Sequence, residues 1–258
     1  MKKIAVITPT YNRAHFIKDC IDSVSESITY NLFTIEHIIV DDGSTDDTRK
    51  LLEKIDNIKT FYLGHNKGQS YARNYAVQKT DADYIFALDS DDIIFQNSLR
   101  YLFTFLEELK QEWVCTDILR CNEKMEYIIG RDFWGWKFDN ILQALESIFT
   151  GRHLLQQNMF YSRKLFEKVG GFDEEIHMSE DLDLAIRFLL NGYFCNYLNV
   201  PSYLYRIHNT NETKDFIGDQ AGNLHRLNMK ILYSKHKQTL KQKLPSKSIE
   251  KIEQYINS

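Results

Sequence analysis

The sequence has few residues that interrupt or cross-link a chain. Three prolines and eleven glycines in 258 residues leave little room for disordered linkers. The four cysteines form no Cys-x-x-Cys pair, and none has a histidine at zinc spacing; they are Cys20, Cys115, Cys121 and Cys195. We therefore expect a folded cytosolic protein with reduced thiols in its core or at its surface.

Long apolar runs are also missing. No stretch approaches the roughly 20 apolar residues that a membrane span requires. The apolar run that begins at Ile4 is broken at Pro9 and has no small-residue cleavage site, so we interpret it as part of the fold and not as a signal peptide. These absences predict a cytoplasmic location, with any membrane contact peripheral and at the inner face of the cell membrane.

Neither sign of charge dominates the whole chain, but the charges are unevenly placed. The net charge of −4 argues against a general nucleic-acid binder. Residues 225–258 contain eight Lys or Arg and two acids, so this tail carries about +6 and the remainder about −10. A Lys-rich amphipathic end is most often a solvated face, and it can also contact an anionic membrane. The sequence leaves open whether the protein is a homo-oligomer.

Two common nucleotide-binding motifs are absent. No G-x-G-x-x-G follows the first apolar run, which disfavours a dinucleotide-binding fold. No G-x-x-x-x-G-K-[ST] occurs either, which excludes a P-loop. Any nucleotide chemistry must therefore use other residues.

The first half of the chain alternates between strand-like and helix-like segments. Short apolar runs at 4–8, 35–40, 58–63 and 84–88 have the length of buried strands, and an amphipathic or helix-like segment follows each one. Four such repeats predict an α/β fold with a mostly parallel central sheet and helices on both faces. Helical spacing near the end of the chain adds a helical C-terminal tail.

Three carboxylates, Asp89, Asp91 and Asp92, follow the last of these runs. Two carboxylates about 4 Å apart repel by roughly 4 kcal/mol at an effective dielectric near 20, whereas a helix cap contributes only about 1 kcal/mol. A divalent cation with oxygen ligands therefore explains the cluster better than capping does. The alternative, in which Ser90, Asp91 or Asp92 caps the next helix, stays open.

Polar segments also end the other three predicted strands, and a parallel sheet brings all four ends to one edge. Tyr11 offers a ring for a base, Asp42 can accept hydrogen bonds from a base or ribose, and Arg73 offers a fork for phosphate. With a metal on Asp91, these groups suggest a nucleotide diphosphate bound through a cation. Asp42 equally fits a turn with a helix cap, and Arg73 a surface ion pair worth under about 1 kcal/mol.

Four segments follow one another along the first half of the chain: V-I-T-P-T-Y-N-R (6–13), V-D-D-G-S-T-D (40–46), N-K-G-Q-S-Y-A-R-N (66–74) and A-L-D-S-D-D (87–92). In this order and spacing they resemble family 2 glycosyltransferases with the A-type nucleotide-sugar fold. The resemblance implies a UDP-sugar donor, a Mn²⁺ or Mg²⁺ ion and inverting transfer to an acceptor hydroxyl. It also suggests an acceptor from cell-envelope polysaccharide biosynthesis: a surface glycan, a teichoic acid or a lipid-linked glycan.

The resemblance further implies roles by position. The donor-binding residues would be Pro9, Tyr11, Asp42, Asn66, Lys67, Arg73, Asp89 and Ser90. Asp91 would bind the metal. In some family members a histidine at the place of His208 completes the metal site, although a lone histidine is usually structural.

Two later segments, G-G-F-D-E (170–174) and E-D-L-D-L-A-I-R (180–187), resemble the same family. The Asp of the family's Glu-Asp pair is the catalytic base, a role that transfers to Asp181. Glu180 would orient the acceptor or help to hold the base. Acids in the first turn of a helix are also what its dipole favours, so this second explanation stays open.

We predict a donor-binding half at 1–112, an acceptor-binding and catalytic half at 113–215 and a basic helical extension at 216–258. Short strands are expected at 113–118 and 127–129, and the aromatic residues of 133–136 suit either sugar stacking or packing. Two rival functions are a nucleotidyltransferase, which usually needs a Gly-rich loop after the first strand, and a non-catalytic glycan-binding module. The transferred sugar, a hexose or an N-acetylhexosamine, stays open.

Overall fold

The computed structural model of the chain describes residues 1–129, 138–151, 159–211 and 221–258. Its first half contains β1 (Lys2–Thr10), α1 (Ile17–Ser25), β2 (Phe33–Asp41), α2 (Thr48–Leu52), β3 (Lys59–Tyr62), α3 (Gln69–Gln78), β4 (Tyr84–Ala87), β5 (Ile93–Ile94) and α4 (Ser98–Leu109). Its second half contains β6 (Trp113–Asn122), α5 (Ile141–Phe149), β7 (Met159–Ser162), α6 (Arg163–Lys168), α7 (Glu180–Leu190), β8 (Asn196–Ile207), α8 (Ala221–Lys243) and α9 (Ser246–Ile256). The aromatic segment at 133–136 lies outside the described residues.

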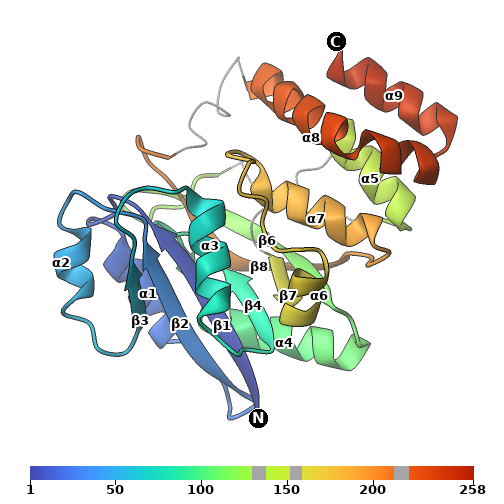
Figure 1. Cartoon of the computed structure of the whole chain (residues 1–258). Helices are drawn as coiled ribbons and strands as arrows, with labels where there is room; N and C mark the ends of the chain where they lie inside the picture. Colours follow the sequence, from blue (N-terminus) through green and yellow to red (C-terminus); the bar gives the residue numbers. More distant parts are fainter. Residues whose placement is uncertain (130–137, 152–158, 212–220) are drawn as a thin grey trace.

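The strands of the described residues form one sheet in the order β3-β2-β1-β4-β7-β6-β8-β5 (Figure 1). Strands β3, β2, β1 and β4 are mutually parallel, and β6 is parallel to β8. Strand β7 is antiparallel to both of its neighbours, and β5 is antiparallel to β8. The predicted α/β fold is confirmed, and the four parallel strands bring their carboxyl ends to one edge of the sheet.

Helices cover both faces of the sheet. The position of β1 between them explains why residues 4–7 of this strand are all apolar. Ile4 and Val6 pack on one face against residues of α1 and α4, whereas Ala5 and Ile7 pack on the other face. That second face is covered by α3 and by α5 to α9, several of which lie side by side in Figure 1. A strand buried on both sides needs apolar residues at every position.

His37 on β2 is a titratable side chain that is buried in this sheet. Its Nε2 lies 2.9 Å from Thr8 Oγ1 on β1, and burial lowers the pKa of His37 to about 3. An unfolded histidine titrates near 6.5, so below that pH the unfolded state binds a proton at His37 that the folded state does not bind. The stability contributed by neutral His37 is therefore complete above pH 6.5 and declines as the pH falls toward 3.

When the pH is lowered from 7.5 to 5, we expect His37 to reduce the free energy of unfolding by about 2 kcal/mol. Urea unfolding of the wild type and of His37→Gln at both pH values measures this contribution. The carboxylates that also titrate are the same in the two proteins, so the difference between them isolates His37. The variant should lose about 2 kcal/mol less than the wild type on acidification. Equal losses in the two proteins would contradict the prediction.

The C-terminal helices dock on the rest of the fold through a buried carboxylate. Asp183 on α7 is fully buried and lies 2.7 Å from Lys235 Nζ and His236 Nε2 of α8, and 2.7 Å from Arg187 Nε. Although burial favours the neutral acid, the His236 hydrogen bond and the Arg187 charge hold the pKa of Asp183 well below its usual value. Some of the basic residues of the tail therefore serve an internal contact.

The strand predicted at 127–129 is wrong. Only Tyr127 pairs, in a single antiparallel bridge with Cys121. The Asn122 side chain accepts hydrogen bonds from the backbone N–H groups of Lys124 and Glu126, which fixes a tight turn. Beyond it Tyr127 is 47% exposed and Ile129 86% exposed, so no apolar face of a strand is buried there.

All four cysteines are free and buried, which agrees with the prediction of reduced thiols. In the part of the chain that the structure describes, no helix combines the length and the apolar character needed to cross a membrane.

Candidate functional site

Asp42 joins the ends of two neighbouring strands. Its carboxylate accepts hydrogen bonds from Lys67 N at 2.7 Å and Gly68 N at 2.8 Å, which ties the end of β2 to the loop after β3. Helix α2 has Asp47 at its N-cap position, with no side-chain cap bond, so the alternative of a helix cap in the Asp42 segment is wrong. In the same loop Asn66 accepts a hydrogen bond from Gly68 N, and Lys67 Nζ lies over the Tyr71 ring.

Gly43 allows this loop to close. Its φ of +79° lies in the left-handed region, and a Cβ there would lie 2.8 Å from the backbone carbons of His65. We expect Gly43→Ala to destabilise the fold by at least about 1–2 kcal/mol, the usual cost of a left-handed alanine. The matched control is Gly64→Ala, because a Cβ there meets no atom within 4 Å. Urea unfolding measures both variants, and equal midpoints would contradict the prediction.

The end of β1 lies against this loop. The Asn12 side-chain oxygen accepts a hydrogen bond from Thr45 N at 2.8 Å, and the Asn12 backbone N–H donates to Ser44 Oγ at 2.9 Å. Pro9 is buried opposite Val40 of β2, whereas the Tyr11 side chain is 40% exposed. The three residues predicted to hold a base, Pro9, Tyr11 and Asp42, therefore come from adjacent strand ends, and their role stays a prediction.

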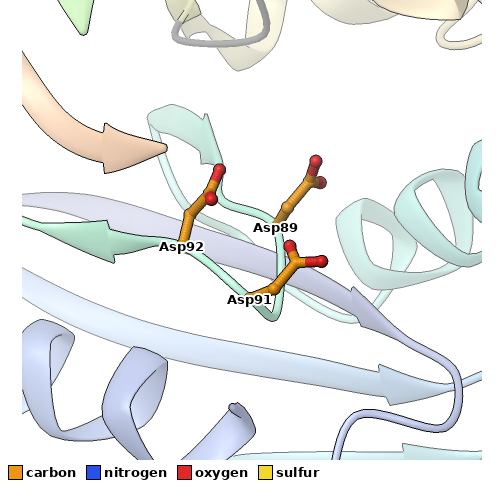
Figure 2. A group of neighbouring side chains, drawn as sticks. All are labelled: Asp89, Asp91 and Asp92. Carbon is orange, nitrogen blue, oxygen red and sulfur yellow. The ribbon is translucent and has the colours of Figure 1, made fainter. Parts of the chain in front are cut away.

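The acidic cluster occupies the turn after β4. Figure 2 shows Asp89, Asp91 and Asp92 on this one turn, and ligand oxygens of the three lie within 4.8 Å of one another. The turn closes with a hydrogen bond from Asp92 N to the Asp89 carbonyl at 3.1 Å, and it buries Ser90. Helix α4 begins only at Ser98, after β5, so the capping alternative for the cluster is wrong.

Asp91 and His208, which the family resemblance assigns to a metal site, lie together. His208 Nε2 lies 2.9 Å from Asp91 Oδ2, and Arg13 Nε donates to the same oxygen at 3.0 Å. The backbone N–H of Thr210 donates to His208 Nδ1 at 3.2 Å. Burial alone would raise the pKa of Asp91, but the His208 hydrogen bond and the Arg13 charge outweigh it and lower that pKa.

Asp92 differs from Asp91 in its surroundings. It is buried and accepts a hydrogen bond from Arg206 N at 2.9 Å. Burial, then the charges of Asp91 and Asp89, raise the pKa of Asp92 well above its usual value. The protein groups around Asp92 therefore disfavour its ionised form. Three carboxylates and one imidazole are a donor set that suits a hard divalent cation such as Mn²⁺ or Mg²⁺.

Arg73 links this cluster to Glu180, the residue before the predicted catalytic base. Its side chain is only 1% exposed, with Nη2 2.6 Å from Asp89 Oδ1 and Nη1 2.5 Å from Glu180 Oε1. The alternative of a surface ion pair is therefore wrong. One buried guanidinium on α3 connects the turn after β4 with the first residue of α7.

Asp181 follows Glu180 at the start of α7 and is only partly buried. Its carboxylate accepts a hydrogen bond from Leu182 N at 2.7 Å. Burial, and next the charge of Glu180, raise the pKa of Asp181 to about 7. A carboxylate with a pKa near neutrality has the proton affinity that a general base needs. Glu180 faces Arg73 in the interior, which favours a role in holding the base over direct contact with an acceptor.

Three residues at this site were not singled out from the sequence. Arg13 contacts Asp91 directly, and the only signal for it was its place at the end of the V-I-T-P-T-Y-N-R segment. The Phe16 ring lies 4.5 Å from the His208 ring and 4.9 Å from the Arg206 guanidinium. Arg206 also pairs with Asp19 of α1 at 2.9 Å, a partner that no local pattern indicates.

A mostly parallel sheet carries an exposed tyrosine, the Asp42 loop and an acidic turn at its carboxyl edge, an arrangement that agrees with the class of A-type nucleotide-sugar folds. Comparison with known families agrees, because residues 5–170 match the family described as "Glycosyl transferase family 2". The chain belongs to this family.

Among curated proteins, a glycosyltransferase of Rickettsia bellii whose function is uncharacterised is 33% identical over 203 residues. The match covers 74% of this chain and 27% of that protein. A second Rickettsia glycosyltransferase, from Rickettsia felis, is 29% identical and is covered to 37% of its length. The chain thus spans between about a quarter and two fifths of these relatives' length.

Among solved structures, residues 1–349 of Staphylococcus aureus TarS in complex with UDP-GlcNAc have a TM-score of 0.72 and 21% identity. The similarity covers 100% of this chain and 72% of the TarS chain. This likeness establishes the fold.

Proposed function

We propose that the chain is a metal-dependent inverting glycosyltransferase that moves a sugar from a UDP-sugar to a hydroxyl of a glycan, teichoic acid or lipid-linked acceptor. The observation that carries the proposal is the contact set of Arg73, which joins Asp89 of the acidic turn to Glu180 beside Asp181. A donor held at the acidic turn would therefore lie near a group able to take a proton. A mannosyltransferase from Pyrobaculum calidifontis solved with GDP-Man and Mn²⁺ has a TM-score of 0.62 and 17% identity, over 91% of this chain and 64% of that one, which agrees in fold.

The donor pocket would use the four strand ends. Tyr11 offers an exposed ring for the base, next to Pro9 and Asp42. Asp89 and Ser90 would lie near the ribose, with Asn66 and Lys67 on the neighbouring loop and Arg73 behind them. Asp91 and His208 would hold Mn²⁺ or Mg²⁺, which when bound stabilises the charge of the leaving diphosphate.

The transfer itself is a single displacement. The acceptor oxygen forms a bond to the anomeric carbon while the bond from that carbon to the diphosphate oxygen breaks, and UDP departs. Asp181 accepts the proton of the acceptor hydroxyl, so no second carboxylate is needed as a proton donor. Attack from the face opposite the diphosphate inverts the anomeric centre, which gives a β-linked product from an α-linked donor.

Calorimetric titration of UDP into the purified protein tests the donor assignment. We expect binding in the presence of Mn²⁺, loss of binding with excess chelator, and loss of binding in Asp91→Ala. The matched control is Asp56→Ala, an exposed aspartate after α2, which should bind UDP like the wild type. Absence of UDP binding with Mn²⁺ present would contradict the assignment, and binding of another nucleoside diphosphate would redirect it.

Consumption of the donor then separates the remaining alternatives. Release of UDP from UDP-GlcNAc or a UDP-hexose supports sugar transfer, and the preferred donor decides between N-acetylhexosaminyl and hexosyl transfer. Release of pyrophosphate would indicate a nucleotidyltransferase. Binding without turnover of any donor, tested with glycan and lipid-linked acceptors, would favour a non-catalytic glycan-binding module.

We also propose that α8 contacts an anionic membrane surface. The helix contains no acidic residue, and on its exposed face Leu227 is 54% exposed and Ile231 52% exposed beside Lys230. A basic face with apolar side chains at its centre suits anionic lipid head groups. The tail would thus bring the acceptor side of the protein to lipid-linked substrates.

Vesicle sedimentation tests the α8 contact. The protein should bind vesicles containing phosphatidylglycerol at low salt, bind far less at high salt, and ignore vesicles of phosphatidylcholine alone. Lys230→Glu should weaken this binding, and Lys54→Glu, an exposed lysine after α2, serves as the control. Equal binding of both variants would contradict a role for α8.

A further inference from the structure

The carboxylate predicted to bind the metal already has a protein cation on it. Arg13 Nε donates to Asp91 Oδ2 at 3.0 Å, and the two side chains are largely buried. His208 Nε2 contacts the same oxygen at 2.9 Å. A carboxylate oxygen has two lone pairs, so these two partners use the full hydrogen-bonding capacity of Oδ2.

The other bonds of the Arg13 guanidinium are weaker. Nη2 donates to the Thr210 carbonyl at 3.3 Å, and Nη1 donates to the carbonyls of Tyr11 and Asn12 at 3.3 and 3.4 Å. These distances lie at the long end of the range for hydrogen bonds, and the acceptors are neutral. The charge-assisted bond to Asp91 is therefore the main restraint on the guanidinium.

A divalent cation and Arg13 cannot share Asp91 without strong repulsion. The guanidinium is charged at every accessible pH, so it cannot relieve the conflict by losing a proton. Two positive charges within a few ångströms repel strongly in a site that excludes most water. Arg13 therefore opposes metal binding for as long as it stays on Asp91.

We propose that Arg13 is the counter-ion of Asp91 before the donor binds, and that the guanidinium leaves Asp91 when the cation arrives and then binds the donor's diphosphate. The proposal rests on the function proposed above and adds a specific partner for the diphosphate. A nucleoside diphosphate supplies oxygen ligands for the cation, and it also supplies an anion for the displaced guanidinium of Arg13. Cation and nucleotide then strengthen each other's binding by the same factor, as linkage requires.

Mn²⁺ binding followed by electron paramagnetic resonance of the free ion tests this competition without any turnover. The proteins are the wild type, Arg13→Gln, Arg13→Lys and the control Arg49→Gln, whose guanidinium pairs with Glu53 at the surface. Without nucleotide, Arg13→Gln should bind Mn²⁺ at least about tenfold more tightly than the wild type. Arg13→Lys, which keeps a positive charge, and Arg49→Gln should stay within about threefold of the wild type.

The second arm repeats the titrations with UDP. The advantage of Arg13→Gln should shrink or reverse, because the diphosphate has lost its guanidinium partner. At saturating Mn²⁺ the variant should also bind UDP about tenfold more weakly than the wild type. If Arg13→Gln binds Mn²⁺ more tightly than the wild type by the same factor with and without UDP, the proposed contact of Arg13 with the diphosphate is wrong.

Unchanged or weaker Mn²⁺ binding by Arg13→Gln without nucleotide would overturn the proposal and leave Arg13 as a permanent tie between the end of β1 and residue 210. Arg13→Met repeats the test with a second neutral side chain, and thermal melting shows that each variant is folded. Failure of the donor assignment looks different: the wild type itself would then bind no UDP at any Mn²⁺ concentration.

Discussion

Replacing Asp181 with Asn is expected to lower kcat by about 10²- to 10⁴-fold, the usual contribution of a general base. Asparagine keeps the shape of the side chain but cannot accept the proton of the acceptor hydroxyl. Binding of UDP in the presence of Mn²⁺ should stay within about twofold of the wild type, because the hydrogen bond that Asp181 accepts comes from Leu182 N of its own helix and not from the acidic turn. Steady-state release of UDP and calorimetry measure the two quantities.

The pH dependence gives Asp181 a signature that a merely structural residue lacks. Burial and the charge of Glu180 raise the pKa of Asp181 to about 7, and only the ionised form can act as a base. The kcat of the wild type should therefore rise about tenfold per pH unit below 7 and level off above it. This limb should be missing from the residual activity of Asp181→Asn.

The matched control is Glu175→Gln, which neutralises an exposed carboxylate in the loop before α7. It should keep both the rate and the pH profile of the wild type. An Asp181→Asn variant with a normal rate, or one with a slow rate but an unchanged pH limb, would remove Asp181 from the role of base.

The parts of the fold that could be predicted are those set by local apolar patterns. The runs at 4–8, 35–40, 58–63 and 84–88 became β1 to β4. Strands β1 and β4 and the second half of β2 are buried between helices, whereas the edge strand β3 is only partly buried. Strand β5, with only two residues, was not predicted, since Ile93 and Ile94 pair with Leu204 and Tyr203 far along the chain. Such a pairing has no local signal.

The same distinction applies to the site. Asp89, Asp91 and Asp92 were predicted to cluster because four neighbouring positions hold them on one turn. The partners of these carboxylates come from elsewhere: Arg13 lies 78 residues before Asp91, and Arg206 lies 114 residues after Asp92. Arg13 contacts Asp91 through its guanidinium, and Arg206 contacts Asp92 through its backbone N–H. Which group meets which carboxylate depends on tertiary packing, so the sequence pattern could not decide it.

Two structural alternatives failed for a related physical reason. Caps by the Asp42 and Asp91 segments were reasonable from composition, but their helices begin several residues later, at Thr48 and Ser98. The intervening residues form loops that bridge neighbouring strands, and those loops supply better partners for a carboxylate than a distant helix end. Asp42, for example, takes two backbone N–H groups at 2.7 and 2.8 Å.

The largest expected effect on stability belongs to Arg73. Arg73→Met keeps most of the side-chain volume but leaves two carboxylates, Glu180 and Asp89, without their buried cation. Removing one partner of a buried ion pair costs about 3–5 kcal/mol, so the variant should unfold at much lower urea concentration. Arg49→Met, which breaks an exposed pair with Glu53, should cost under about 1 kcal/mol.

The destabilisation by Arg73→Met should depend on pH in a definite direction. Burial already raises the pKa of Glu180 although Arg73 opposes the shift, and without Arg73 that pKa must rise further. A carboxyl group whose folded pKa exceeds its unfolded value destabilises the fold above the unfolded pKa, near 4.5, and not below it. The deficit of Arg73→Met should therefore be largest at neutral pH and shrink as the pH falls toward 4.5.

Neutralising the stranded carboxylates provides the internal check. The triple variant with Arg73→Met, Glu180→Gln and Asp89→Asn should recover a large part of the lost unfolding free energy, because it buries no uncompensated charge. Recovery would show that the lost unfolding free energy comes from the uncompensated carboxylates and not from lost packing of the Arg73 side chain. A single variant as stable as the wild type at pH 7.5 would instead mean that the two carboxylates are protonated or solvated without Arg73.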